Sequence, residues 1–155
     1  MSETMRSDLF RVHAMVLSTA QMRAWRLFLE AHAKTVRRLE QELADEQDLA
    51  LSWYDLLVQL QEHGGTMRMG ELARRLLISR SATTRFVDRV EAAGLVKRSV
   101  SSDDRRGMDV VLTDEGFRRL KGASPTHLRG IERHFADRLS DEDAELLARI
   151  LAKLG

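Results

Sequence analysis

Apolar residues recur every three or four positions along most of the chain, and this spacing predicts a protein built mainly from helices. The pattern runs through residues 5–45 and predicts one long amphipathic helix, with Ser18–Thr19 available as a fresh start. A shorter helix is predicted over 53–62, with Ser52 as its N-cap. The apolar face of the long helix is larger than a small domain can cover, so it predicts contact with a partner helix.

Two short helices joined by a tight turn are predicted between residues 71 and 93, which is typical of a helix-turn-helix. The first covers 71–77. The second runs from Ser79, a good N-cap, to Gly94, a residue that commonly ends helices. Its predicted inner side is formed by Thr83, Phe86, Val87 and Val90. Its predicted outer side carries Ser81, Thr84, Arg85 and Asp88, none of which is large and apolar.

After Gly94 the helical spacing gives way to alternation of apolar and polar residues. Residues 95–100 and 108–112 each alternate, which predicts two half-buried strands of a hairpin, and residues 66–69 could add a short third strand. The connecting segment SSDDRRG has no apolar residue and predicts a polar tip that carries two arginines. Such a tip fits the narrow, negative minor groove of DNA, although an ordinary charged turn is the alternative.

Residues 114–155 predict two further helices. Thr113 is the predicted N-cap of the first, and Gly122 and Pro125 predict a bend or break within it. Ser140 opens a sequence that resembles a capping box at the start of the last helix, whose apolar stripe reaches Leu154. Amphipathic helices therefore flank the central module on both sides.

Charge distinguishes the central module from the rest of the chain. The whole chain has 25 basic and 24 acidic residues, for a net charge of +1, whereas residues 66–107 alone carry +5 and the remainder −4. Positive charge is thus concentrated where phosphate would bind. The N-terminal end of the second short helix suits contact with phosphates and base edges, which makes Ser79, Arg80 and Ser81 candidates. A solvated polar face is the alternative reading.

Length and composition narrow the class of protein. The 155 residues, 43% of them hydrophobic, suffice for one core, and the absence of cysteine excludes disulfides and thiol redox sensing. We expect a cytoplasmic protein without a membrane partner, because no run of 18 apolar residues and no signal-peptide core is present. No catalytic motif is recognisable, so neither an enzyme nor a cofactor is predicted. His127 and His134 are too far apart along a helix to chelate one ion by themselves, so no metal site is predicted either.

The central residues resemble the winged helix-turn-helix of the MarR family of bacterial transcriptional regulators. The resemblance rests on two motifs at the family's separation, LARRLLISRSATTRFVDRVEAAGLV and the wing DRRGMDVVLT, and in general layout it extends to the flanking helices. It implies a mainly α fold with a small antiparallel β-wing, in which a winged helix-turn-helix DNA-binding domain is flanked by N- and C-terminal dimerisation helices. The expected layout is a single domain over 1–155 with dimerisation helices at 5–45 and 114–155, the winged helix-turn-helix at 52–113 and the wing at 95–113.

The resemblance also implies which residues meet double-stranded DNA. The recognition helix enters the major groove, Arg106 enters the minor groove, and Asp104 helps to orient the wing. Taken with the residue patterns, the predicted DNA contacts are Ser79, Arg80, Ser81, Thr84, Arg85, Asp104, Arg105 and Arg106. Because one winged helix-turn-helix contacts few base pairs, a two-fold homodimer on a pseudo-palindromic operator is expected.

By resemblance, the function is that of a repressor released from its operator by a small aromatic or anionic ligand. The candidate ligand contacts are Trp25, Arg26, His32, Trp53 and Tyr54, because aromatic rings could stack on a ring while a cation pairs a carboxylate. The alternative is that these aromatic residues simply fill the core. A second functional reading is a winged-helix module for protein contact without specific DNA binding, and the charge of +5 argues against it.

Overall fold

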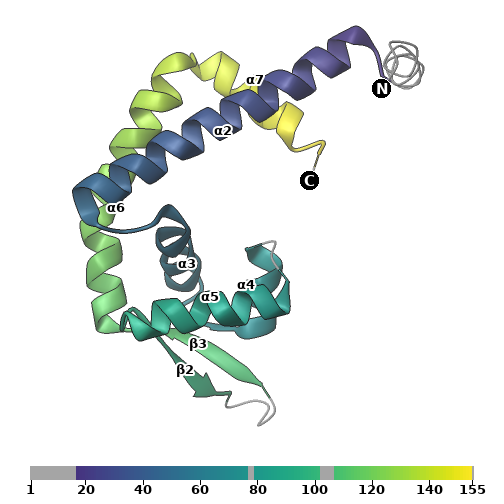
Figure 1. The fold of residues 1–155 in the computed structure, drawn as a ribbon. Helices are drawn as coiled ribbons and strands as arrows, with labels where there is room; N and C mark the ends of the chain where they lie inside the picture. The colour runs from purple at the N-terminus through teal and green to yellow at the C-terminus, as the bar shows by residue number, and fades with distance from the viewer. Residues whose placement is uncertain (1–16, 77–78, 102–106, 155) are drawn as a thin grey trace, which may run out of the picture. The chain divides into compact units, whose positions relative to one another are not determined.

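The computed structural model describes residues 17–76, 79–101 and 107–154 (Figure 1). The chain forms two compact units, residues 1–38 and 39–155. The described part is mainly helical with a small three-stranded antiparallel sheet, which confirms the predicted fold class. Within the described ranges, no helix is both long enough and apolar enough to cross a membrane.

Helix α2 (Thr19–Gln47) begins at the fresh start that the sequence offered. The Ser18 hydroxyl accepts a hydrogen bond from the Gln21 N–H at 3.1 Å, and the Gln21 side-chain oxygen accepts one from the Ser18 N–H at 2.7 Å. This reciprocal capping satisfies two backbone donors at the helix start. The helical turns predicted over 5–16 lie outside the described residues. From Leu39 onward α2 belongs to the second unit, and its buried residues are Leu39 and Leu43.

Helix α3 (Leu51–Glu62) begins two residues earlier than predicted, and Ser52 is not its N-cap. The N-cap is Ala50, whose carbonyl accepts hydrogen bonds from the N–H groups of Trp53 and Tyr54, both at 3.0 Å. Leu51 is buried in the core, so its apolar side chain rather than a capping hydroxyl sets where the helix begins. The prediction was wrong because a good capping residue was preferred over the burial of its apolar neighbour.

The predicted helix-turn-helix is present as α4 (Met69–Arg75) and α5 (Arg80–Ala92). Ser79 is the N-cap of α5, as predicted, and its hydroxyl accepts a hydrogen bond from the Ala82 N–H. Gly94 follows the end of α5 with a φ of 75°, a conformation that glycine adopts readily.

Strands β1 (Thr66–Arg68), β2 (Val96–Val100) and β3 (Met108–Leu112) form one antiparallel sheet in the order β1-β3-β2. Both outer strands pair with β3, so the short third strand predicted before α4 is confirmed. The hairpin is less buried than its alternation predicted, because Val100 is 61% exposed and Met108 41%. These two residues pair with each other at the outer end of the ribbon, so the apolar side chains of the ribbon are buried only toward its base.

Helix α6 (Asp114–His134) begins at Thr113, its N-cap as predicted, and runs without a break through Gly122 and Pro125. Of the predicted bend or break, a break therefore does not occur. A buried face on the helix, formed by Leu120, Ala123, Thr126 and Gly130, outweighs the hydrogen bond that proline cannot make.

The chain continues through a 3-10 turn, η1 (Ala136–Arg138), into helix α7 (Asp141–Leu151). The predicted capping box is confirmed, since Ser140 and Asp143 cap each other's backbone N–H groups. No residue of α7 is buried.

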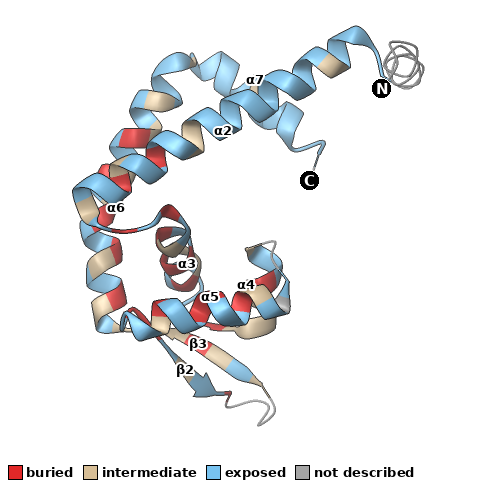
Figure 2. Cartoon of the chain, in the orientation of Figure 1, coloured by how far each residue is buried: buried red, intermediate tan, exposed pale blue. Residues whose placement is uncertain are grey.

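The core of the second unit lies between α3, α5, α6, the sheet and the C-terminal part of α2 (Figure 2). Its largest fully buried side chains are Leu43, Leu56, Leu57, Leu60, Leu72, Val87, Val90, Val96, Val110 and Thr83. The core thus includes the inner side predicted for the recognition helix, which orients that helix and exposes its opposite face.

Candidate nucleic-acid interface

The recognition helix α5 is anchored by its inner face. Thr83, Val87 and Val90 have no exposed surface, and the Thr83 hydroxyl donates a hydrogen bond to the Ser79 carbonyl at 2.9 Å. A helix held by side chains on one side has a defined rotation about its axis. The face that it turns outward is therefore set by the core.

The residues predicted to meet base edges lie on that outward face. Ser79, Ser81, Thr84 and Arg85 are all exposed at the N-terminal end of α5. The hydroxyls of Ser79 and Ser81 lie 3.2 Å apart, so two small polar groups share the first turn. Small side chains there allow the helix backbone to approach a groove closely, and Arg85 offers a forked donor for a guanine edge or a phosphate.

Part of the predicted interface lies outside the described residues. The structure does not describe the side chain of Arg80. It also does not describe residues 102–106, which include Asp104, Arg105 and Arg106. Their predicted contacts with DNA therefore stay predictions.

The base of the wing is joined to α5 through Arg98, a residue that the sequence reasoning missed as a functional candidate. Its guanidinium donates to the carboxylate of Asp88 and, at 3.1 Å, to the backbone carbonyl of Thr84. It also pairs with Glu91 at 3.2 Å, and its own N–H donates to the other Glu91 oxygen at 2.7 Å. A signal was present in the sequence, since Arg98 alternates with Val96 and Val100 on one side of the strand, where a charged residue among apolar ones needs a partner.

Ion pairs reduce the positive charge that is available to phosphate. Glu71 pairs with both Arg74 and Arg75 within α4, and Asp109 pairs with Arg68. Together with the pairs of Arg98, these contacts involve four of the basic residues in the positive segment. Among the residues that the structure describes, Arg85 on α5 and Lys97 on β2 are exposed and have no ion-pair partner. Their charge is free to attract the DNA backbone.

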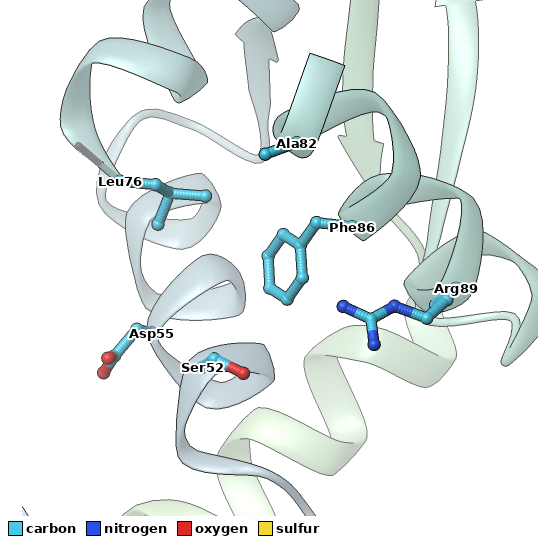
Figure 3. A pocket seen from close by; sticks show the side chains of 6 residues that line it. All are labelled: Ser52, Asp55, Leu76, Ala82, Phe86 and Arg89. Atoms are coloured by element: carbon cyan, nitrogen blue, oxygen red, sulfur yellow. The ribbon is translucent and has the colours of Figure 1, made fainter. Parts of the chain in front are cut away.

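A cavity of about 410 Å³ opens between α3 and the inner side of α5 (Figure 3). Its lining residues are Ser52, Asp55, Leu76, Ala82, Phe86 and Arg89. The Phe86 ring points into the space, and the Arg89 guanidinium carbon lies 5.9 Å from the centre of that ring. An aromatic face beside a cation is suited to an aromatic anion.

The residues predicted for ligand binding do not line this cavity. Tyr54 is buried between α3 and α6, where its hydroxyl donates to the Ser124 hydroxyl at 3.3 Å, so it fills the core as the alternative reading had it. Trp53 is half-buried on α3. Trp25, Arg26 and His32 are exposed residues of the first unit, and their role stays a prediction. Phe86 and Arg89 were missed because their proximity to α3 arises only in the tertiary structure.

Two titratable groups, Asp55 of the cavity lining and His127 of α6, influence each other's pKa. Burial raises the pKa of Asp55, against the attraction of His127, and burial lowers the pKa of His127, against the attraction of Asp55. The His127 ring packs on Tyr54 with 4.5 Å between ring centres. His134 lies further along α6 and donates to Glu42 at 2.7 Å. Within the described ranges, no group of three His, Asp or Glu residues is placed to hold a metal ion.

Comparison with known proteins agrees with this geometry. The model of the MarR family matches residues 47–107. The HTH-type transcriptional repressor MdtR of Bacillus subtilis is 29% identical over 128 residues, which cover 83% of this chain and 81% of MdtR.

Two solved structures from Streptomyces coelicolor extend the similarity to almost the full length. AbsC, a MarR family transcriptional regulator, is 34% identical with a TM-score of 0.83, over 89% of this chain and 93% of AbsC. Sco3205, a MarR family transcriptional regulator in complex with DNA, is 32% identical with a TM-score of 0.83, over 89% of this chain and 87% of Sco3205. With the exposed polar face of α5 beside its β-wing, this similarity establishes that the chain belongs to the MarR family of DNA-binding transcriptional regulators and is not an enzyme.

Proposed function

We propose that the chain is a homodimeric repressor that binds a pseudo-palindromic operator and is released from it by a small aromatic or anionic ligand. The observation that carries the DNA-binding part is the outward face of α5, where Ser81, Thr84 and Arg85 are exposed above a fully buried inner face. This face enters the major groove, and Arg105 and Arg106 at the wing tip reach the adjacent minor groove. We also propose a cytoplasmic location, because a bacterial regulator meets its DNA there.

Two relatives support this proposal. Sco3205 is a structure in complex with DNA, and MdtR is a transcriptional repressor. Repression follows physically when a bound dimer covers the DNA that the transcription machinery needs. The operator is pseudo-palindromic because a two-fold dimer presents two identical recognition helices, one to each half-site.

Uncovered apolar surface in the second unit supports the dimer. The C-terminal segment exposes large apolar side chains at Leu128, Phe135, Leu146, Ile150, Leu151 and Leu154. A helix such as α7, with an apolar stripe and no buried residue, gains stability only when a further surface covers the stripe. We assign that surface to the same segment of a second copy.

The cavity beside Phe86 supports the ligand part of the proposal. A bound aromatic carboxylate would stack on Phe86 and pair with Arg89, both of which lie on the recognition helix. Occupation of the cavity would move α5 relative to α3. The ligand releases DNA to the extent that it binds the displaced arrangement more tightly than the DNA-bound one.

Selection of bound sequences from a random duplex pool tests the DNA-binding proposal. We expect enrichment of an inverted repeat and a steep loss of affinity between low and moderate salt. The double variant Thr84→Ala, Arg85→Ala is expected to flatten the sequence preference by about 1–3 kcal/mol per lost base contact. Retained preference would show that another face of α5 reads the bases, and binding that ignores salt would favour the protein-contact module.

Two further measurements test the dimer and the ligand. Sedimentation is expected to show a dimer, and Ile150→Glu is expected to weaken it because the substitution places a charge on the apolar stripe of α7. Benzoate is expected to lower the affinity for the selected operator, and Arg89→Met is expected to reduce that effect. A strictly monomeric protein, or benzoate that acts equally on the Arg89→Met variant, would contradict the respective part of the proposal.

A further inference from the structure

Arg98 of β2 contacts three residues of the recognition helix α5, although no sequence motif indicated these contacts. Its partners Thr84, Asp88 and Glu91 are spaced four and three residues apart, so they lie on successive turns of one side of α5. The guanidinium bonds to all three, and the backbone N–H of Arg98 bonds to Glu91 as well. A planar guanidinium carries donors on separate nitrogens and can span acceptors on successive turns, whereas the three donors of an ammonium share one nitrogen.

The position of Arg98 along β2 makes these bonds an attachment between the wing and α5. Val96, at the start of the strand, is fully buried, whereas Val100, two residues beyond Arg98, is 61% exposed. Apolar burial therefore holds only the base of the ribbon, and the next attachment toward the tip is the polar one that Arg98 makes. The side chain of Arg98 is itself only 23% exposed, which shields its ion pairs from solvent more than ordinary surface pairs.

We propose that Arg98 is a positioning residue that fixes the angle between the wing and the recognition helix, so that the two parts enter adjacent grooves as one rigid body. The proposal rests on the proposed function, since it concerns how the DNA is read. Arg98 reads no base in this scheme, because its guanidinium is held against Thr84, Asp88 and Glu91 of α5. Its contribution is preorganisation: without the bridge, the wing must be ordered at the moment of binding.

Three variants separate positioning from direct contact and from simple charge. Arg98→Met removes the guanidinium and keeps an apolar stem of similar length. Arg98→Lys keeps the charge without the fork. Arg98→Met combined with Asp88→Asn keeps the net charge of the cluster as in the native protein, because one cation and one anion are removed together. Lys97→Met is the matched control, since it removes one positive charge from the next residue of β2, which has no ion-pair partner among the described residues.

The experiment measures the affinity of each variant for the selected operator over a series of salt concentrations, and repeats the selection from the random pool. For Arg98→Met and Arg98→Lys we expect about a tenfold loss of operator affinity with an unchanged salt slope, because no phosphate contact is lost. Preference at the flanking positions next to the wing is expected to weaken, while preference at the positions read by α5 is kept. The charge-matched double variant is expected to stay as weak as Arg98→Met, and Lys97→Met is expected to keep the flanking preference.

Four results would overturn the inference. A salt slope that falls by about 0.9 in Arg98→Met would show that Arg98 contacts a phosphate. Full recovery in the charge-matched double variant would show that Arg98 only masks Asp88. Native affinity and flanking preference in Arg98→Lys would show that the fork has no role, and this variant keeps the test decisive if Arg98→Met does not fold. Failure of the native protein to bind any duplex would overturn the proposed function together with this inference, whereas the first three results leave the proposed function intact.

Discussion

Gly116 is the position where one added methyl group has the largest calculable consequence. It lies in the first turn of α6, directly against the end of the segment that follows the recognition helix. A Cβ at Gly116 would be 2.0 Å from the Leu95 carbonyl oxygen and 2.8 Å from a methyl carbon of Leu112. Ordinary contact begins at 3.4 Å, so the backbone of Leu95 or of α6 would have to move by about 1.4 Å.

Such a movement disturbs the hydrogen bonds that join α6 to the module. The Leu95 carbonyl accepts the Thr113 N–H at 3.2 Å, and the Thr113 hydroxyl donates to the Gly94 carbonyl at 2.7 Å. Overpacking costs about 1–3 kcal/mol, and each weakened hydrogen bond adds about 1 kcal/mol. Gly116→Ala is therefore expected to lower the free energy of unfolding by about 3 kcal/mol or more, which corresponds to a drop in Tm of about 10 °C for a chain of this size.

Gly122→Ala supplies the matched control, because it is the same substitution in the same helix. Gly122 is exposed, and nothing lies within 4 Å of the Cβ that it would gain. Alanine is favoured over glycine in a helix interior by about 1 kcal/mol, so this variant is expected to raise Tm by about 2–4 °C. Thermal unfolding followed by circular dichroism, at one protein concentration for all variants, measures both shifts. A Gly116→Ala variant that melts within about 2 °C of the native protein would refute the close approach of Leu95 to α6.

Two further substitutions give expected outcomes that depend on single contacts. Ser79→Ala removes the cap of α5 and is expected to cost about 1 kcal/mol in urea unfolding, with Ser79→Asn restoring it; equal stability of the alanine variant would contradict the capping role. The hydrogen bond from His134 is the main cause that lowers the pKa of Glu42 below 4.5, and the charges of His134 and Arg133 act in the same direction. Because folding favours the ionised carboxylate, this stabilisation is complete above pH 4.5 and is lost as pH falls through the lowered pKa. Glu42→Gln is therefore expected to be less stable than the native protein at neutral pH and to lose less stability on acidification. Unfolding midpoints of both proteins, measured from pH 7 to 3, check this. The same change in midpoint for both proteins over that range would refute it.

Local features of the fold were predictable from the sequence because their causes lie within a few residues. Ser79 and Thr113 each cap a helix whose first free N–H is three positions away, and Ser140 does the same with Asp143. Gly94 follows the end of α5 with a positive φ, a conformation that glycine adopts readily, so the residue type alone indicated the helix end. The outward polar face of α5 was predictable for the same reason, since the apolar residues on its inner face follow the helical period.

Features that depend on contacts between distant segments were not predictable in this way. Gly122 and Pro125 were expected to bend or break α6, but a break is avoided because residues on the same helix are buried in the core. Tyr54 was predicted to contact a ligand, and only the tertiary structure places Ser124, seventy positions away, beside its hydroxyl. No rule of local spacing contains the packing that places these residues.

The sequence by itself determined the family, the helical periods, the caps and the segment in which positive charge gathers. Only the tertiary structure decided which of those charges remain free, because ion pairs such as Arg98–Asp88 join residues ten positions apart on different elements. It also decided where a ligand could fit, since the cavity exists only once α3 and α5 pack together with Phe86 between them. The physical reason is that periodicity and capping are energies of neighbouring residues, whereas charge pairing and cavities are properties of surfaces brought together by folding.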